Sequence, residues 1–76
     1  MEIKIRTEHI TLGQFLKLAD FIGSGGQAKL FIETNTIKVN GTPIIQRGKK
    51  LYPGDIIMVN NESYSITGGS IASKNT

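Results

Sequence analysis

The stretch from Gly23 to Lys29 joins two segments of helical periodicity and constrains the fold more than any other part of the chain. Ser24 with Gln27 three residues later is a capping-box pattern, which satisfies amide groups left free where a helix begins. Gly25 and Gly26 place no side chain over those amides, so another backbone or a phosphate can approach the positive end of the helix dipole. Two interpretations are open: a tight turn between packed helices, or a phosphate-binding corner with the final lysine of the stretch one turn further in.

A helix is predicted on each side of this corner. Thr11 and Gln14 form another capping box, and the apolar residues after it recur at helical spacing, so the first helix spans roughly residues 12–22. The second helix runs from about residue 25 to residue 34. Asn35 follows it as the expected left-handed C-terminal cap.

The other segments have the alternating pattern of strands. Asn40-Gly41 is the strongest short hairpin signal in the chain, and Pro43 restricts the strand after it to an edge or a bulge. Strands are predicted for residues 2–6, 37–39, 42–45, 56–59 and 64–66. The fold class is therefore α+β: two short packed helices followed by a small, mostly antiparallel sheet, with an N-terminal strand added.

A chain of 76 residues is long enough for one domain, which we expect to span residues 1–67. Residues 68–76 are small and polar, a composition that predicts a flexible C-terminal tail. The chain has no cysteine, which excludes disulfides and thiolate zinc sites. No stretch resembles a signal peptide or reaches membrane-spanning length, so we expect a cytoplasmic protein that has no membrane partner. We also expect a monomer.

The basic charge is concentrated in the middle of the sequence. The formal net charge is only +3, but residues 17–50 contain six basic residues against Asp20 and Glu33. The segment 46–50, Gln-Arg-Gly-Lys-Lys, has no apolar residue, so we expect an exposed basic loop. Such asymmetry suits a polyanionic partner, while a plainly solubilising surface is the alternative.

The residue types needed for catalysis do not occur together. His9 is the only histidine and is expected to be a solvated loop residue, and the acidic residues are spread along the chain. Gly48-Lys49 is followed by Lys50, where a nucleotide-binding loop needs serine or threonine. We therefore predict no enzymatic activity, no catalytic residue, no metal site and no cofactor.

Two short helices followed by the segment 32–41 resemble the αL RNA-binding domain of ribosomal protein S-four. That family typically has Ser-Arg-x-x-Ala and then Ile-x-x-Gly-x-Val-x-Val-Asn-Gly. The matching positions are Ser24, Ala28, Ile32, Ile37, Val39, Asn40 and Gly41. Gly54-Asp55-Ile56 fits the later Gly-Asp-x-Ile of the family, and the resemblance covers about residues 10–60.

Two departures limit what can be transferred from that family. Gly25 replaces the usual arginine of the second helix, and Lys29 is the candidate substitute for it. The segment 11–14, Thr-Leu-Gly-Gln, lacks the common Arg-Leu-Asp opening of the first helix. The combination of the glycine-rich corner with the basic loop looks like the small stand-alone bacterial YaaA/YbcJ-type branch, in which this domain is the whole protein.

The resemblance implies binding to structured RNA, usually ribosomal or transfer RNA, through the paired helices and the adjacent basic loop, in association with the ribosome or its assembly. The alternative is a protein-interaction module that docks on a ribosomal or biogenesis protein and uses its basic loop for solubility or steering. The predicted RNA-binding residues are Lys17, Ser24, Gly25, Gly26, Gln27, Lys29, Lys38, Arg47, Lys49 and Lys50.

Overall fold

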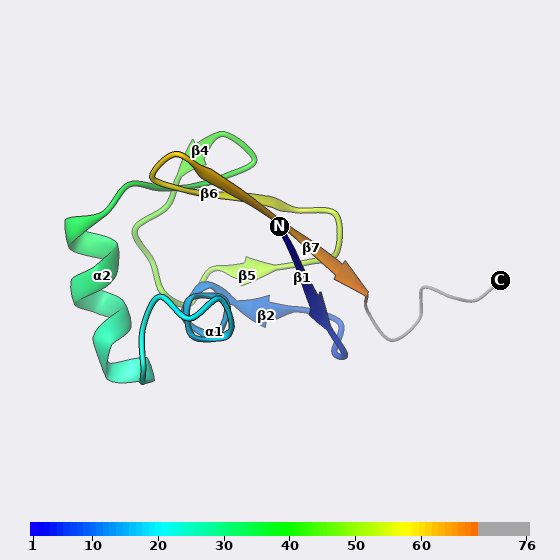
Figure 1. The fold of residues 1–76 in the computed structure, drawn as a ribbon, viewed down its shortest axis with the longest axis horizontal. Helices are drawn as coiled ribbons and strands as arrows, with labels where there is room; N and C mark the ends of the chain where they lie inside the picture. Colours follow the sequence, from blue (N-terminus) through cyan, green and yellow to red (C-terminus); the bar gives the residue numbers. More distant parts are fainter. Residues whose placement is uncertain (69–76) are drawn as a thin grey trace, which may run out of the picture.

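The structure, a computed structural model, describes residues 1–68, so the tail predicted for residues 68–76 lies outside the described residues except for Gly68. Two helices and a short 3₁₀ turn lie on one side of a curved sheet (Figure 1). The elements are β1 (Glu2–Ile5), β2 (Ile10–Thr11), α1 (Leu12–Leu18), η1 (Gly25–Gln27), α2 (Ala28–Thr34), β3 (Ile37–Val39), β4 (Thr42–Pro43), β5 (Lys50–Leu51), β6 (Ile56–Val59) and β7 (Glu62–Gly68).

The main sheet has five strands in the order β1-β7-β6-β3-β4. Only β1 and β7 pair in parallel, with Ile3 opposite Ile66, and the other pairs are antiparallel. Pro43 lies in the edge strand β4, as predicted, where its missing amide costs no ladder bond. The α+β class predicted from the sequence, with two helices and an added N-terminal strand, is confirmed.

The turns of the sheet follow local chemistry. Asn40 and Gly41 have φ angles of 52° and 85°, the left-handed pair that a two-residue hairpin requires. Gly68 has a φ of 94°, and a Cβ there would lie 2.5 Å from the carbonyl oxygen of Ile5. Only glycine therefore permits the close approach of β1 and β7 at this position.

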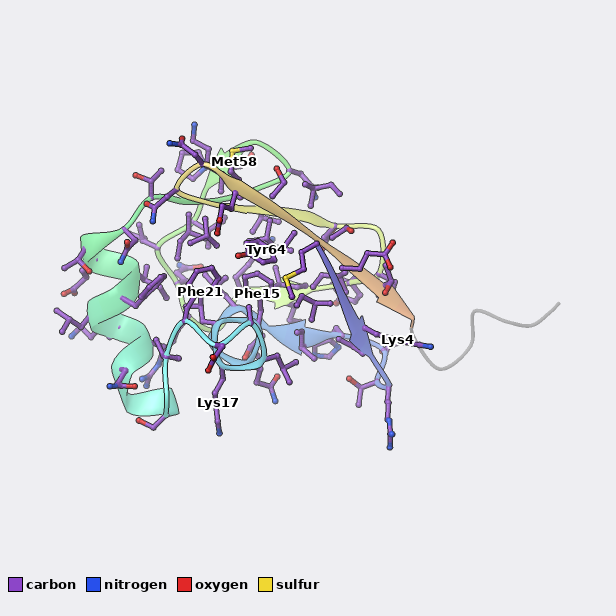
Figure 2. The ribbon with its side chains drawn as sticks, in the orientation of Figure 1. Lys4, Phe15, Lys17, Phe21, Met58 and Tyr64 are labelled. Atoms are coloured by element: carbon purple, nitrogen blue, oxygen red, sulfur yellow. The ribbon has the colours of Figure 1, made fainter. Side chains whose placement is uncertain are left out.

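The core lies between the sheet and the helices. Phe15 and Leu16 of α1 are fully buried, and Ile57 of β6 is fully buried on the facing side of the sheet. Phe15 meets Tyr64 of β7 edge to face, with ring centroids 5.5 Å apart (Figure 2). This packing fixes α1 against the sheet and leaves its other side available to solvent.

A second, two-stranded sheet formed by β2 and β5 was not predicted. Ile10 pairs with Leu51 and Thr11 pairs with Lys50. The prediction of a basic loop over residues 46–50 was wrong at Lys50, because that residue belongs to β5. Strands of two residues are too short for an alternating pattern, so the sequence gives no periodic signal for them.

The first helix is shorter than predicted. It ends at Leu18 rather than near residue 22, because Asp20 has a left-handed φ of 68°. The amide of Asp20 donates to the carbonyl of Lys17, and the amide of Phe21 donates to the carbonyl of Leu16. These are the two bonds of a Schellman ending, here with aspartate at the position that glycine usually takes.

The second helix begins as a 3₁₀ turn at Gly25 and continues as α2 from Ala28. The prediction of a left-handed cap at Asn35 was wrong, because its φ and ψ of −133° and 158° are extended. The side chain of Asn35 instead caps the helix, with Nδ2 donating to the carbonyl of Phe31 at 3.0 Å. A side-chain amide thus satisfies a terminal carbonyl without a backbone reversal.

Candidate nucleic-acid interface

The start of α1 holds the basic loop in place. The predicted capping box forms: the amide of Gln14 donates to Thr11 Oγ1 at 3.2 Å, and the amide of Thr11 donates to Gln14 Oε1 at 2.9 Å. The next two free amides bind the loop, because Leu12 N donates to the Lys49 carbonyl at 2.8 Å and Gly13 N donates to the Arg47 carbonyl at 2.9 Å. The loop is therefore exposed but fixed against the helix.

A depression of about 400 Å³ lies between α1, the start of the second helix and the basic loop. Lys17 of α1 and Arg47 of the basic loop both line it and supply its positive charge. It is lined by Thr11, Gly13, Gln14, Lys17, Gly25, Ala28, Arg47 and Gly48. Three segments that are separate in the sequence thus form one cationic recess on the surface.

Gly13 sits at the closest approach of these three segments. A Cβ added to it would meet the Arg47 carbonyl oxygen at 3.6 Å and the Ala28 Cβ at 3.7 Å, which are ordinary van der Waals distances. An alanine therefore fits, whereas a longer side chain would project into the depression. Glycine here keeps the recess open between α1 and α2.

The start of the second helix is organised by Gln27. Its Oε1 accepts hydrogen bonds from the amides of Gly23 at 2.6 Å and Ser24 at 3.2 Å, which forms the amide half of the predicted capping box. A Cβ on Gly25 would meet nothing within 4 Å, and one on Gly26 would meet only Ser24 Oγ at 3.9 Å. Within residues 1–68, no group accepts a hydrogen bond from the amides of Gly25 and Gly26.

The other exposed cations of the helices and the loop belong to the same segments as the residues that line this recess. Lys17 extends from α1 away from the core (Figure 2). Lys29 is exposed in the first turn of α2, directly after the 3₁₀ start of the second helix. Lys49 and Lys50 are exposed next to the loop carbonyls that α1 binds. We call this surface, formed by α1, residues 24–29 and residues 46–50, the helix-loop face.

The structure does not bring Lys38 to the helix-loop face. Ile37 and Val39 of β3 are buried in the core, so Lys38 between them points out of the opposite side of the sheet. Its cross-strand partner is Met58, and Figure 2 shows Met58 and Lys17 on opposite sides of the molecule. We call the surface that carries Lys38 and Met58 the outer sheet face.

The titratable groups are spread over the structure. No group of three or more histidine, cysteine, aspartate or glutamate residues within residues 1–68 could hold a metal ion. Burial raises the pKa of Tyr64, and the hydrogen bond from its hydroxyl to Glu62 Oε1 at 2.9 Å raises that pKa further. His9 is half-buried against Tyr52 rather than solvated, which corrects the expectation for that residue.

The lining of the recess was only partly foreseen. Thr11 and Gln14 were predicted as a helix cap, but their position beside the basic loop was not. Gly13 was noted as part of a departure from a family pattern and not as a candidate site residue. Its position between Thr11 and Gln14 of the capping box is itself a signal, because helices disfavour glycine.

No helix within the described residues is long and apolar enough to span a membrane.

Comparison with known proteins agrees with this architecture. The chain is 56% identical over 57 residues to a Bacillus subtilis (strain 168) protein named "Probable ribosome maturation protein RlbA", an alignment that covers 75% of this chain and 80% of that relative. The family model described as the S4 domain matches residues 3–67, which includes both helices, the basic loop and all of the main sheet except the end residues Glu2 and Gly68. The chain therefore belongs to the S4 domain family.

Proposed function

We propose that this chain is a non-catalytic RNA-binding protein that recognises structured RNA, ribosomal or transfer RNA, and acts with the ribosome or in its maturation. The observation that carries the proposal is the recess of the helix-loop face, with Lys17 and Arg47 on its walls. Membership of the S4 domain family supports it, and so does the relative whose name refers to ribosome maturation.

The geometry suits RNA phosphates in three ways. The loop carbonyls are already bound by Leu12 and Gly13, so the loop loses little conformational freedom when RNA binds. The uncovered amides of Gly25, which lines the recess, and of Gly26 next to it can donate to a phosphate. Double-stranded RNA is recognised mainly through shape and backbone, which a small cationic surface can read.

Binding should weaken steeply with salt. Three or four phosphate contacts from the helix-loop face correspond to a log-log slope of affinity against salt of roughly −2 to −4, because each contact releases condensed counterions. Filter binding of an RNA hairpin over a series of KCl concentrations measures this slope. A flat response would contradict a phosphate-reading surface.

The decisive experiment reverses the charge of the basic loop. Replacing Arg47, Lys49 and Lys50 by glutamate should abolish association with an RNA hairpin and with ribosomes, because three attractions become repulsions. All three residues are exposed, and exposed substitutions usually change the free energy of unfolding by about 0.5 kcal/mol or less each. Circular dichroism of the variant should therefore match that of the parent.

The chain offers a matched control for that variant. Lys4, Arg6 and Lys38 are likewise one arginine and two lysines. Lys4 and Lys38 each lie between buried residues on strands of the main sheet, Arg6 directly follows β1, and none of the three belongs to the helix-loop face. Their reversal changes the net charge equally and should weaken RNA binding far less. If both variants lose affinity equally, only net charge matters and the proposed face is wrong.

A second function, docking on a protein, is favoured if the loop variant still sediments with ribosomes at physiological salt. The outer sheet face exposes Ile56 by 45% and Met58 by 38%, which gives an apolar surface for a ribosomal or biogenesis protein. Substituting these two residues by lysine would then abolish sedimentation, and the protein-interaction function would replace the RNA-binding one.

A further inference from the structure

The two-stranded sheet of β2 and β5 has an outer surface. Of the predicted RNA-binding residues, only Lys50 belongs to it. Ile10 and Leu51 form a cross-strand pair and are buried in the core, with 7% and 0% of their surface exposed. Because successive side chains of a strand alternate in direction, the residues that flank this pair point outward. They are Thr11 opposite Lys50, and His9 beside Tyr52.

His9 and Tyr52 form an aromatic pair, with ring centroids 5.4 Å apart and a tilt of 42° between the rings. The tyrosine remains 44% exposed, whereas His9 is half-buried behind it. An exposed aromatic ring supported from one side offers its other surface to a planar ligand.

The backbone on both sides of this pair is fixed. The amide of Tyr52 donates to Asp55 Oδ2 at 2.8 Å, and its carbonyl accepts from the amide of Asp55 at 3.0 Å. On the other strand, Thr7 Oγ1 donates to the carbonyl of His9 at 2.7 Å. Ordering the tyrosine for a ligand therefore requires little further loss of backbone entropy.

His9 is not explained by stability. Its Nδ1 is buried and has no hydrogen-bond partner within the described residues, an arrangement that costs free energy compared with an apolar side chain of similar size. The ring contributes its flat surface to Tyr52 while that nitrogen stays unpaired. Protein contacts alone therefore do not account for a histidine at this position, beside an exposed aromatic ring.

We infer that Tyr52, supported by His9, is a stacking site for one unpaired nucleobase of the RNA that the helix-loop face binds. This inference rests on the proposed function. Lys50 precedes Tyr52 by two residues, a rise of about 6.6 Å along the strand, so one nucleotide can place its base on the ring and its phosphate at the lysine. The RNA class is thus a helix with an adjoining bulge or loop rather than a uniform duplex.

The neighbourhood favours a nucleobase over an apolar protein segment. Lys49 and Lys50 precede the ring, and Thr11 links this surface to the recess that holds Arg47. These cations attract a polyanion and outnumber the Asp55 carboxylate that accepts from the Tyr52 amide, while an apolar peptide would have to desolvate them. Stacking on an aromatic ring is tolerant of base identity, so the site should read the presence of an unpaired base more than its type.

The test uses two RNA hairpins with the same stem, one fully paired and one with a single bulged adenosine. The full chain should bind the bulged hairpin more tightly. Tyr52→Leu should lower affinity for the bulged hairpin by about 5- to 100-fold and leave affinity for the paired hairpin within about twofold, because stacking is lost only where a free base exists. Tyr52→Phe keeps the ring and should retain the preference.

A fluorescence measurement reports the stacking directly. The chain has no tryptophan, so Tyr52→Trp introduces a single reporter whose emission should be quenched by the bulged hairpin and less by the paired one. Met58→Trp places the same reporter on the outer sheet face and should show little quenching by either RNA. This control separates stacking at Tyr52 from any general effect of RNA binding.

Each outcome decides between the possibilities. If Tyr52→Leu weakens both hairpins equally, or weakens neither, the stacking site is wrong, while RNA binding by the parent and its loss in the charge-reversal variant still support the proposed function. If the parent chain binds neither hairpin, the proposed function fails and the stacking site falls with it. Equal quenching at positions 52 and 58 would likewise overturn the site.

Discussion

The two helix starts carry the same sequence signature and end up in different states. At the first, which we call the closed start, Thr11 and Gln14 form the cap, and the amides of Leu12 and Gly13 bind the carbonyls of the basic loop. At the second, which we call the open start, Gln27 binds the amides of Gly23 and Ser24, and no side chain covers the amides of the two glycines that follow. A capping pattern therefore locates a helix start but does not say whether that start serves the fold or remains available to a ligand.

The largest effect on RNA binding and stability is expected at Gly13, where the closed start borders the recess. Gly13→Leu should weaken binding of an RNA hairpin by at least about tenfold and lower the free energy of unfolding by about 1–3 kcal/mol, because the side chain would press on the loop and fill the depression. Gly13→Ala is the matched control, since its Cβ fits at ordinary distances. Hairpin titration and thermal melts of both variants measure the two effects, and parent-like behaviour of the leucine variant would remove the recess from the site.

Removing the cap of the closed start should have the next largest effect. Thr11→Ala deletes the acceptor for the amide of Gln14 and should cost about 1 kcal/mol of stability, or a fall in melting temperature of about 4–8 °C. Thr11→Ser keeps the hydroxyl and should recover most of that loss. An alanine variant that melts with the parent would mean that the loop carbonyls alone hold this helix start.

At the open start the effect should fall on binding and not on folding. Gly25→Leu or Gly26→Leu should weaken RNA binding several-fold, because bulk covers amides that a phosphate would approach. Stability should not fall, since the positions are exposed and leucine is the better helix former. A drop in melting temperature with unchanged affinity would show that these glycines serve only the turn.

The smallest effect is expected for a single cation beside the open start. Lys29→Glu should lower RNA affinity by roughly two- to fivefold, because one exposed charge pair is worth up to about 1 kcal/mol. Lys38→Glu makes the same change on the outer sheet face and should leave affinity nearly unaltered. If the two variants behave alike, the comparison between the two faces does not hold.

Much of the fold was predictable because it depends on local chemistry. Both capping boxes, the left-handed turn at Asn40-Gly41 and the edge position of Pro43 follow from neighbouring residues in the chain. The end of α1 was missed because aspartate rarely takes the left-handed position that Asp20 occupies. The pairing of β2 with β5 was missed because the two partners are about forty residues apart and too short to alternate.

The candidate site was predictable in its charge but not in its geometry. The basic residues could be counted, yet counting did not separate Lys38 from the others. The alternation of Ile37, Lys38 and Val39 contained that information, because two buried neighbours direct the residue between them out of the sheet. The aromatic pair of His9 and Tyr52 depends on the β2–β5 pairing and could therefore not be predicted from the sequence.

The parallel pairing of β1 with β7 determines when this protein can fold during its synthesis. Glu2 lies opposite Ser65, so the first strand has to wait for a partner that is made 63 residues later. Until then Ile3 and Ile5, both buried in the finished structure, have no sheet to cover them. The helices and the basic loop can form earlier from nearby segments, but the sheet that supports them closes only after residue 68 has left the ribosome.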